Sequence, residues 1–166
     1  TEAEGLVSNV IFSMAIDSSD IKWIGTSNGL AKFTGMNWTI YTELNSGLPS
    51  NEIFSIALDS SGNKWIGTRK GLAKFDPKTE QFEIIDEKGA GINLSIDGDG
   101  TIWYAGAGYL TYDRLFSRLY KGGVGLNSYN PKIKEITRIS VDDGLLSNAI
   151  MGLEVDDSGK VWTSSK

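Results

Sequence analysis

Large hydrophobic residues alternate with small or polar residues in several short stretches of the chain. Between residues 10 and 16 the large residues are Phe12, Met14 and Ile16, and the small ones between them are Ser13 and Ala15. The same alternation returns between residues 52 and 58. A period of two indicates a β-strand with both faces packed, and turn residues bound each stretch. The pattern therefore predicts an all-β protein built from short strands.

These stretches belong to a repeat. Residues 47–75 align with residues 5–33 without a gap, at an offset of 42 residues. Trp65 and Trp23 occupy equivalent positions, and each follows an aspartate (Asp59 or Asp17) by six residues. A period of about 40 to 45 residues with a tryptophan landmark is typical of a β-propeller blade, which has four antiparallel strands. We therefore expect blades, each with a buried tryptophan between neighbouring sheets.

Two further units follow, marked by Asp97 with Trp103 and by Asp156 with Trp162. The expected repeats are approximately 5–46, 47–90, 91–143 and 144–166, with an insert near 106–123 and an incomplete last repeat. The insert is interpreted as an extended hairpin or as a loop over one face. Residues 1–166 are thus expected to form a partial propeller of about three and a half blades, as a fragment or completed by another chain.

The aspartates are expected in hairpin turns, where a carboxylate accepts bonds from backbone amides. A calcium site is the alternative, but the stretch from Asp97 to Gly100 supplies only the opening of a calcium-binding loop, so no metal is predicted. Glu154 stands where Ala15, Ala57 and Ser95 stand in the other repeats. Because a buried carboxylate is costly, this face of the last repeat is expected to be open or wet.

Composition excludes several functions. The net charge of −5 argues against a nucleic-acid partner, and no apolar run is long enough for a membrane span. The chain has no cysteine and no histidine, so it cannot build a thiolate metal site, a Ser-His-Asp triad or an imidazole base. No carboxylate pair stands out for glycoside hydrolysis. We therefore predict no catalytic residues and no cofactor.

The chain closely resembles the two-component regulator propeller repeat, through Gly47–Asn51, Asp59–Gly62, Trp65–Thr68 and Gly71–Pro77. Proteins with this repeat are commonly periplasmic sensor regions of hybrid two-component systems in Bacteroidetes, with seven-bladed propellers ahead of a membrane span and a kinase. The resemblance implies part of a seven-bladed ring in a periplasmic or cell-surface sensor of oligosaccharides, and a possible homodimer in the parent protein. The same repeat also occurs in secretion-associated surface proteins.

Candidate ligand-binding residues are those that do not recur between repeats. In a propeller, the loop between the second and third strands lies on the same face as the connection between blades. Sugar recognition uses aromatic rings with planar polar groups, which favours Asn28, Arg69, Lys70, Tyr104 and Tyr109. The asparagines that do recur, Asn9, Asn51 and Asn148, are interpreted as turn caps.

Three functions remain open. The preferred hypothesis is a non-catalytic extracytoplasmic sensor segment that binds an oligosaccharide or a partner domain. The alternative is an assembly propeller that makes protein–protein contacts at the cell surface. A propeller-type lyase or glycosidase is disfavoured, because such lyases use histidine as general base and this chain has none.

Overall fold

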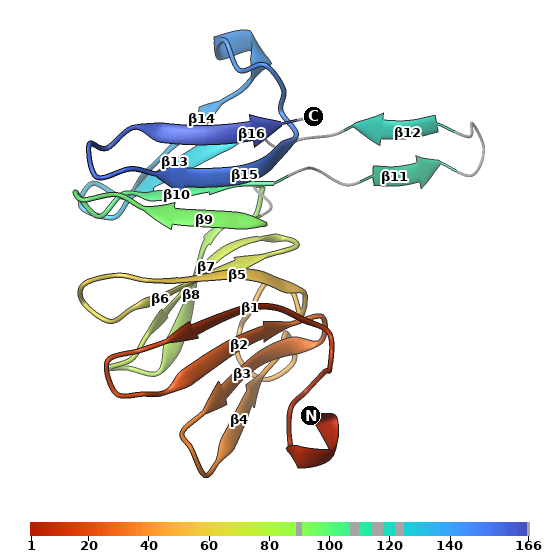
Figure 1. The fold of residues 1–166 in the computed structure, drawn as a ribbon, viewed down its shortest axis with the longest axis vertical. Helices are drawn as coiled ribbons and strands as arrows, with labels where there is room; N and C mark the ends of the chain where they lie inside the picture. Colours follow the sequence, from red (N-terminus) through yellow and green to blue (C-terminus); the bar gives the residue numbers. More distant parts are fainter. Residues whose placement is uncertain (89–90, 107–109, 114–117, 122–124, 166) are drawn as a thin grey trace. The chain divides into compact units, whose positions relative to one another are not determined.

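The computed structural model describes residues 1–88, 91–106, 110–113, 118–121 and 125–165 (Figure 1). The chain divides into two compact units, Thr1–Ile92 and Asn93–Lys166. Every strand pairing in the described residues is antiparallel, and the only helical segments there are the short 3-10 turns η1 (Glu2–Glu4) and η2 (Val141–Asp143). The predicted all-β fold with four-stranded antiparallel blades is confirmed.

Unit 1 contains two four-stranded sheets whose strands follow one another in chain order. The first sheet is β1 (Ile11–Ile16), β2 (Lys22–Thr26), β3 (Gly29–Phe33) and β4 (Trp38–Tyr41). The second sheet is β5 (Ile53–Leu58), β6 (Lys64–Thr68), β7 (Gly71–Asp76) and β8 (Gln81–Asp86). β5, β6 and β7 each begin 42 residues after their counterparts, and both sheets have a register shift at the same place in the first strand. The repeat in the sequence is thus a repeat of strands and pairings.

A glycine opens the third strand of both sheets because no side chain fits there. Gly29 and Gly71 have φ of 138° and 146°, in a region that residues with a Cβ rarely adopt. A Cβ on Gly71 would overlap the carbonyl oxygen of Asp86 in the neighbouring strand β8. The turn into the third strand therefore requires glycine for both its backbone angle and its space.

The core of unit 1 lies between its two sheets. Trp23 of β2 is 1% exposed and packs in a cluster with residues of both sheets and of the connection between them, namely Leu30, Leu48, Ile53, Ile66, Ala73 and Phe75. The ring centroids of Trp23 and Phe75 are 4.9 Å apart. The expected burial of a tryptophan between neighbouring sheets is therefore observed at this position.

Unit 2 contains a third four-stranded sheet, of β9 (Asn93–Ile96), β10 (Ile102–Ala105), β13 (Leu126–Asn130) and β14 (Glu135–Ile139). Between β10 and β13 the chain forms a separate two-stranded pair, β11 (Leu110–Asp113) with β12 (Arg118–Lys121). The described backbone of the insert is thus a hairpin between the second and third strands of the sheet.

Unit 2 ends in a two-stranded sheet, β15 (Ile150–Val155) with β16 (Val161–Ser165). A buried cluster of unit 2 joins Ala105 of β10 and Leu126 of β13 to Ile150 of β15. β15 therefore packs against the four-stranded sheet of the same unit. In the described part of the chain, no helix is long and apolar enough to cross a membrane.

Candidate functional site

An aspartate and a tryptophan are hydrogen-bonded in each of the four repeats. The indole Nε1–H of Trp23 donates to Oδ2 of Asp17 at 3.1 Å, while Oδ1 of Asp17 accepts the backbone N–H groups of Ser19 and Ile21. The equivalent indole bonds measure 3.0, 2.9 and 2.8 Å in Asp59–Trp65, Asp97–Trp103 and Asp156–Trp162. We call this arrangement the Asp–Trp pair. It places the aspartates in hairpin turns, as the sequence predicted.

These hydrogen bonds keep the turn carboxylates ionised at neutral pH. Partial burial opposes ionisation of Asp17, but the bonds from Trp23, Lys64 and the turn amides outweigh it and lower its pKa. The pKa values of Asp59 and Asp97 are lowered by the same balance. The hydroxyl of Ser158 and the indole of Trp162 lower the pKa of Asp156 to about 2. A general acid needs a raised pKa, so these four carboxylates are poor candidates for acid catalysis.

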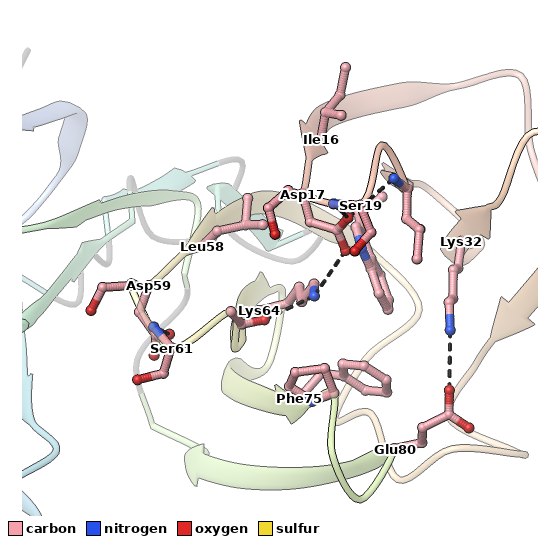
Figure 2. Close-up of a pocket in the computed structure, with 16 residues that line it drawn as sticks. Ile16, Asp17, Ser19, Lys32, Leu58, Asp59, Ser61, Lys64, Phe75 and Glu80 are labelled. Carbon is pink, nitrogen blue, oxygen red and sulfur yellow. Dashed lines mark hydrogen bonds and ion pairs between the residues drawn. The ribbon is translucent and has the colours of Figure 1, made fainter.

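A cleft of about 590 Å³ opens in unit 1 at the β1–β2 and β5–β6 turns (Figure 2). Across it, Lys64 Nζ lies 3.1 Å from Asp17 Oδ2, and the two side chains are only 4% and 9% exposed. A second ion pair joins Lys32 of β3 to Glu80 of the β7–β8 turn, at 3.2 Å. Each ion pair joins one sheet of unit 1 to the other.

The indole of Trp23 lies beside both cations of this cleft. Lys64 Nζ and Lys32 Nζ are 5.0 and 5.6 Å from its ring centroid, within the range of cation–π attraction. Because Trp23 is almost fully buried, its ring offers no surface on which a sugar could stack. The two ion pairs of the cleft join the two sheets of unit 1, and the rest of its lining mixes polar turn residues with apolar side chains such as Ile16 and Leu58.

The opposite end of the strands carries a different set of charges. On the β6–β7 turn, Arg69 Nη1 lies 2.7 Å from Glu52 Oε2, and Lys70 Nζ lies 2.9 Å from Glu43 Oε2. The side chains of Arg69 and Lys70 are 46% and 61% exposed. Glu43 and Asn51 also exchange bonds, each accepting the other's backbone N–H. We call this group, Glu43, Asn51, Glu52, Arg69 and Lys70, the loop-end cluster.

The sequence-predicted ligand residues are only partly brought together. Arg69 and Lys70 are adjacent in the loop-end cluster, and Asn28 is exposed on the equivalent β2–β3 turn of the same unit. Tyr104 lies in β10 of unit 2 and is fully buried, so its ring has no face open to a ligand. Tyr109 lies outside the described residues.

Two of the three recurring asparagines, Asn51 and Asn148, cap the connections between sheets, as interpreted from the sequence. Oδ1 of Asn51 accepts the backbone N–H of Glu43, and Oδ1 of Asn148 accepts that of Val141. Sequence reasoning missed both acidic partners of the loop-end cluster, Glu43 and Glu52. It also missed the Asp–Trp bond, although the constant spacing of six residues was the signal for it.

The comparison with family models gives one match. Residues 47–70 match the model described as "Two component regulator propeller". This stretch runs from the lead-in of β5 through the β6–β7 turn, so it contains Glu52, Arg69 and Lys70 of the loop-end cluster. The resemblance to the two-component regulator propeller repeat is therefore confirmed. A comparison with curated proteins gives no match.

Several solved structures are similar over nearly the whole chain. The extracellular domain of a hybrid two-component system from B. thetaiotaomicron is 22% identical with a TM-score of 0.76, over 98% of this chain and 21% of that one. PorZ, a surface component of the type-IX secretion system of Porphyromonas gingivalis, is 17% identical with a TM-score of 0.67, over 95% and 25%. Virginiamycin B lyase from Staphylococcus aureus is 10% identical with a TM-score of 0.64, over 93% and 48%.

These similarities establish the fold, which is that of a partial propeller. The chain spans between about a fifth and a half of the three proteins, whose own roles differ: signalling, secretion and catalysis. Function must therefore be argued from the residues of this chain.

Proposed function

We propose that this chain is a non-catalytic segment of an extracytoplasmic sensor propeller, and that its loop-end cluster binds an oligosaccharide or a partner domain. The observation that carries the proposal is the pair of exposed ion pairs, Arg69–Glu52 and Lys70–Glu43, at one end of unit 1. The family-model match and the similarity to an extracellular domain of a two-component system support the sensor role and the location.

The fold itself does not require these charges. At the positions equivalent to Arg69, Lys70 and Glu52, the first repeat has Ser27, Asn28 and Val10. Yet both repeats build the same turn, in which the hydroxyl of Thr26 or Thr68 donates to the carbonyl of the glycine three residues later, at 2.8 and 3.0 Å. Exposed ion pairs contribute only about 0 to 1 kcal/mol to stability. The cluster is therefore better explained by binding than by folding.

The chemistry of the cluster suits a polar ligand. Guanidinium and carboxylate groups are planar and offer paired donors and acceptors, which neighbouring sugar hydroxyls can match. The ion pairs already fix these side chains, so less conformational entropy is lost when a ligand binds. The hydrogen bond from Lys70, followed by the amide of Asn51, lowers the pKa of Glu43 and keeps it ionised. Glu43 is thus suited to accept hydrogen bonds rather than to deliver a proton.

A thermal-shift screen of soluble oligosaccharides tests the proposal. A ligand at a hundred times its Kd adds about 2.7 kcal/mol to the stability of the folded state, which for a domain of this size corresponds to roughly 5 to 10 °C. We expect such a shift for at least one oligosaccharide class, and its loss in the Arg69→Ala, Lys70→Ala double variant.

The matched control is the Lys78→Ala, Lys132→Ala double variant, which removes the same charge from exposed positions away from the cluster. A shift that survives in the cluster variant places the ligand elsewhere and contradicts the proposed site. Conversion of any oligosaccharide to products contradicts the non-catalytic role.

A second candidate function, assembly with another protein, is favoured by a different observation. Several large apolar side chains are exposed on strands, including Met14 of β1 and Trp162 of β16, at 62% and 61%. Strand residues that are buried in one repeat and exposed in another indicate a surface that a protein partner covers.

A further inference from the structure

Equivalent tryptophans differ sharply in burial. Trp23 and Trp65 are 1% exposed, whereas Trp162 is 61% exposed, although all three make the same bond to an aspartate. A shallow groove of about 310 Å³ runs beside Trp162 on the β15–β16 sheet. The indole therefore makes the same bond as in the other repeats, but the described residues of unit 2 leave it largely exposed.

Unit 1 shows what covers a tryptophan at this position. The second repeat places Leu48, which precedes β5, and the sheet residues Ile53, Ile66 and Phe75 against Trp23. It also brings Lys64 Nζ to 5.0 Å from the ring centroid and to 3.1 Å from the paired carboxylate of Asp17. The covering surface is thus an apolar sheet face with one lysine at its edge.

The same surface recurs in this chain on the first sheet. Subtracting 42 from the covering residues gives Leu6, Ile11, Ile24, Phe33 and, for the lysine, Lys22. Leu6 and Ile24 form the base of this face with Ala31. Its β1 edge is exposed, at 52% for Ile11, 62% for Met14 and 53% for Ile16. We call this surface the β1 face.

We propose that the face of the β15–β16 sheet that carries Glu154 and Trp162, here called the Trp162 face, docks in one copy of this chain on the β1 face of a second copy, head to tail. The register supports this choice of partner, because the β1 face is a second example of the surface that covers Trp23. When the two faces meet, the exposed indole and the exposed row of large aliphatic side chains are both removed from water. This burial of apolar surface is the main source of association energy.

Charge supports the same pairing. Lys64 donates to the carbonyl of Gly62 and reaches the carboxylate of the preceding sheet, Asp17. Its equivalent, Lys22, donates to the backbone carbonyl of Asp20. Lys22 Nζ also lies 2.7 Å from Asp20 Oδ2, in a side chain that is 82% exposed. A second copy would offer Lys22 the carboxylate of Asp156, the equivalent of Asp17 in the last repeat.

Glu154 makes this contact more polar than the one inside unit 1. It is exposed and directly opposite Trp162 across the β15–β16 pair, where Ala15 lies opposite Trp23. The extra carboxylate lies on the face that Lys22 would approach, so association should weaken as salt is added.

Such an interface is heterologous, because it joins two different surfaces, and this property allows a sharp test. We would measure the molar mass of the full chain by light scattering and sedimentation over a wide concentration range. The monomer mass is 18.0 kDa. We expect a concentration-dependent increase for the unmodified chain, either to a closed pair or to longer chains.

The test variants alter one face each. Trp162→Gln alters the Trp162 face, and Met14→Glu or Lys22→Glu alters the β1 face, all at side chains outside the buried clusters of the chain. Each variant alone should remain a monomer, or nearly so. An equimolar mixture of Trp162→Gln with Met14→Glu retains one intact face of each kind and should form a 1:1 pair that grows no further.

The matched control is Leu44→Ser, which removes a 97% exposed apolar side chain from neither face and should associate like the unmodified chain. An unmodified chain that stays at the monomer mass overturns the proposal and points to another occupant. Association of Met14→Glu alone, or failure of the mixture to pair, also overturns it. The oligosaccharide proposal is tested separately, in the monomeric Trp162→Gln variant, so the two can fail independently.

Discussion

Replacement of equivalent tryptophans by alanine should have very different costs. A tryptophan buries roughly 150 to 250 Å² when fully covered, which at about 25 cal/mol per Å² corresponds to about 4 to 6 kcal/mol. Trp23 is 1% exposed, so Trp23→Ala should lose most of this amount. Trp162 is 61% exposed, so only about two-fifths of its surface is buried and Trp162→Ala should cost roughly 2 kcal/mol. Both variants lose the bond to an aspartate, so that contribution largely cancels in the comparison.

The assay is urea unfolding followed by circular dichroism, at the lowest measurable protein concentration so that association does not stabilise the chain. Because the two tryptophans lie in different units, the unfolding curve is first tested for more than one transition. We expect Trp23→Ala to be less stable than Trp162→Ala by about 2 to 4 kcal/mol. Equal losses, or a larger loss for Trp162→Ala, would refute the inference that burial between sheets distinguishes the two sites.

Three further outcomes are expected. Lys64→Met should destabilise unit 1 by about 2 to 4 kcal/mol because it leaves the nearly buried Asp17 carboxylate without its cation. Adding Asp17→Asn should recover part of this loss, as measured in a double-mutant cycle of urea unfolding. Gly71→Ala should lower the melting temperature strongly because its Cβ would overlap a backbone carbonyl, whereas Gly98→Ala, with open space around it, should change it little. The lowered pKa of Asp156, about 2 against a usual 3.8, stabilises the folded state above pH 4, and this contribution is lost as pH falls toward 2. Acid titration should therefore show a smaller loss of stability over that interval in Asp156→Asn than in the unmodified chain.

The repeat in the sequence predicted the fold well because it reflects local physics. The alternation in β1 and the turn aspartate depend on neighbours within a few residues, and the glycine that opens the third strand depends on its own backbone angle and on the next strand of the same sheet. Trp23 was correctly predicted to be buried between sheets, because its counterpart Trp65 implied an adjacent sheet of the same kind.

The candidate site was harder to predict because its contacts are long-range and do not repeat. Glu43 and Lys70 are 27 residues apart, and nothing in the first repeat resembles their ion pair. Tyr104 was proposed as a ligand residue because it does not recur between repeats, but it lies within β10 and its side chain is fully buried. Sequence pattern alone does not say which non-recurring residue reaches the surface.

The residues of an Asp–Trp pair are close in sequence, and this separation decides the order in which contacts form while the chain is synthesised. Each pair joins residues only six apart, inside one hairpin, whereas the ion pair of Asp17 with Lys64 needs a residue made 47 positions later. Contacts between near neighbours form at the smallest entropic cost and therefore early. A hairpin leaving the ribosome can thus fix the orientation of its indole before the next sheet exists, so that each newly made sheet meets a partner that is already shaped to receive it.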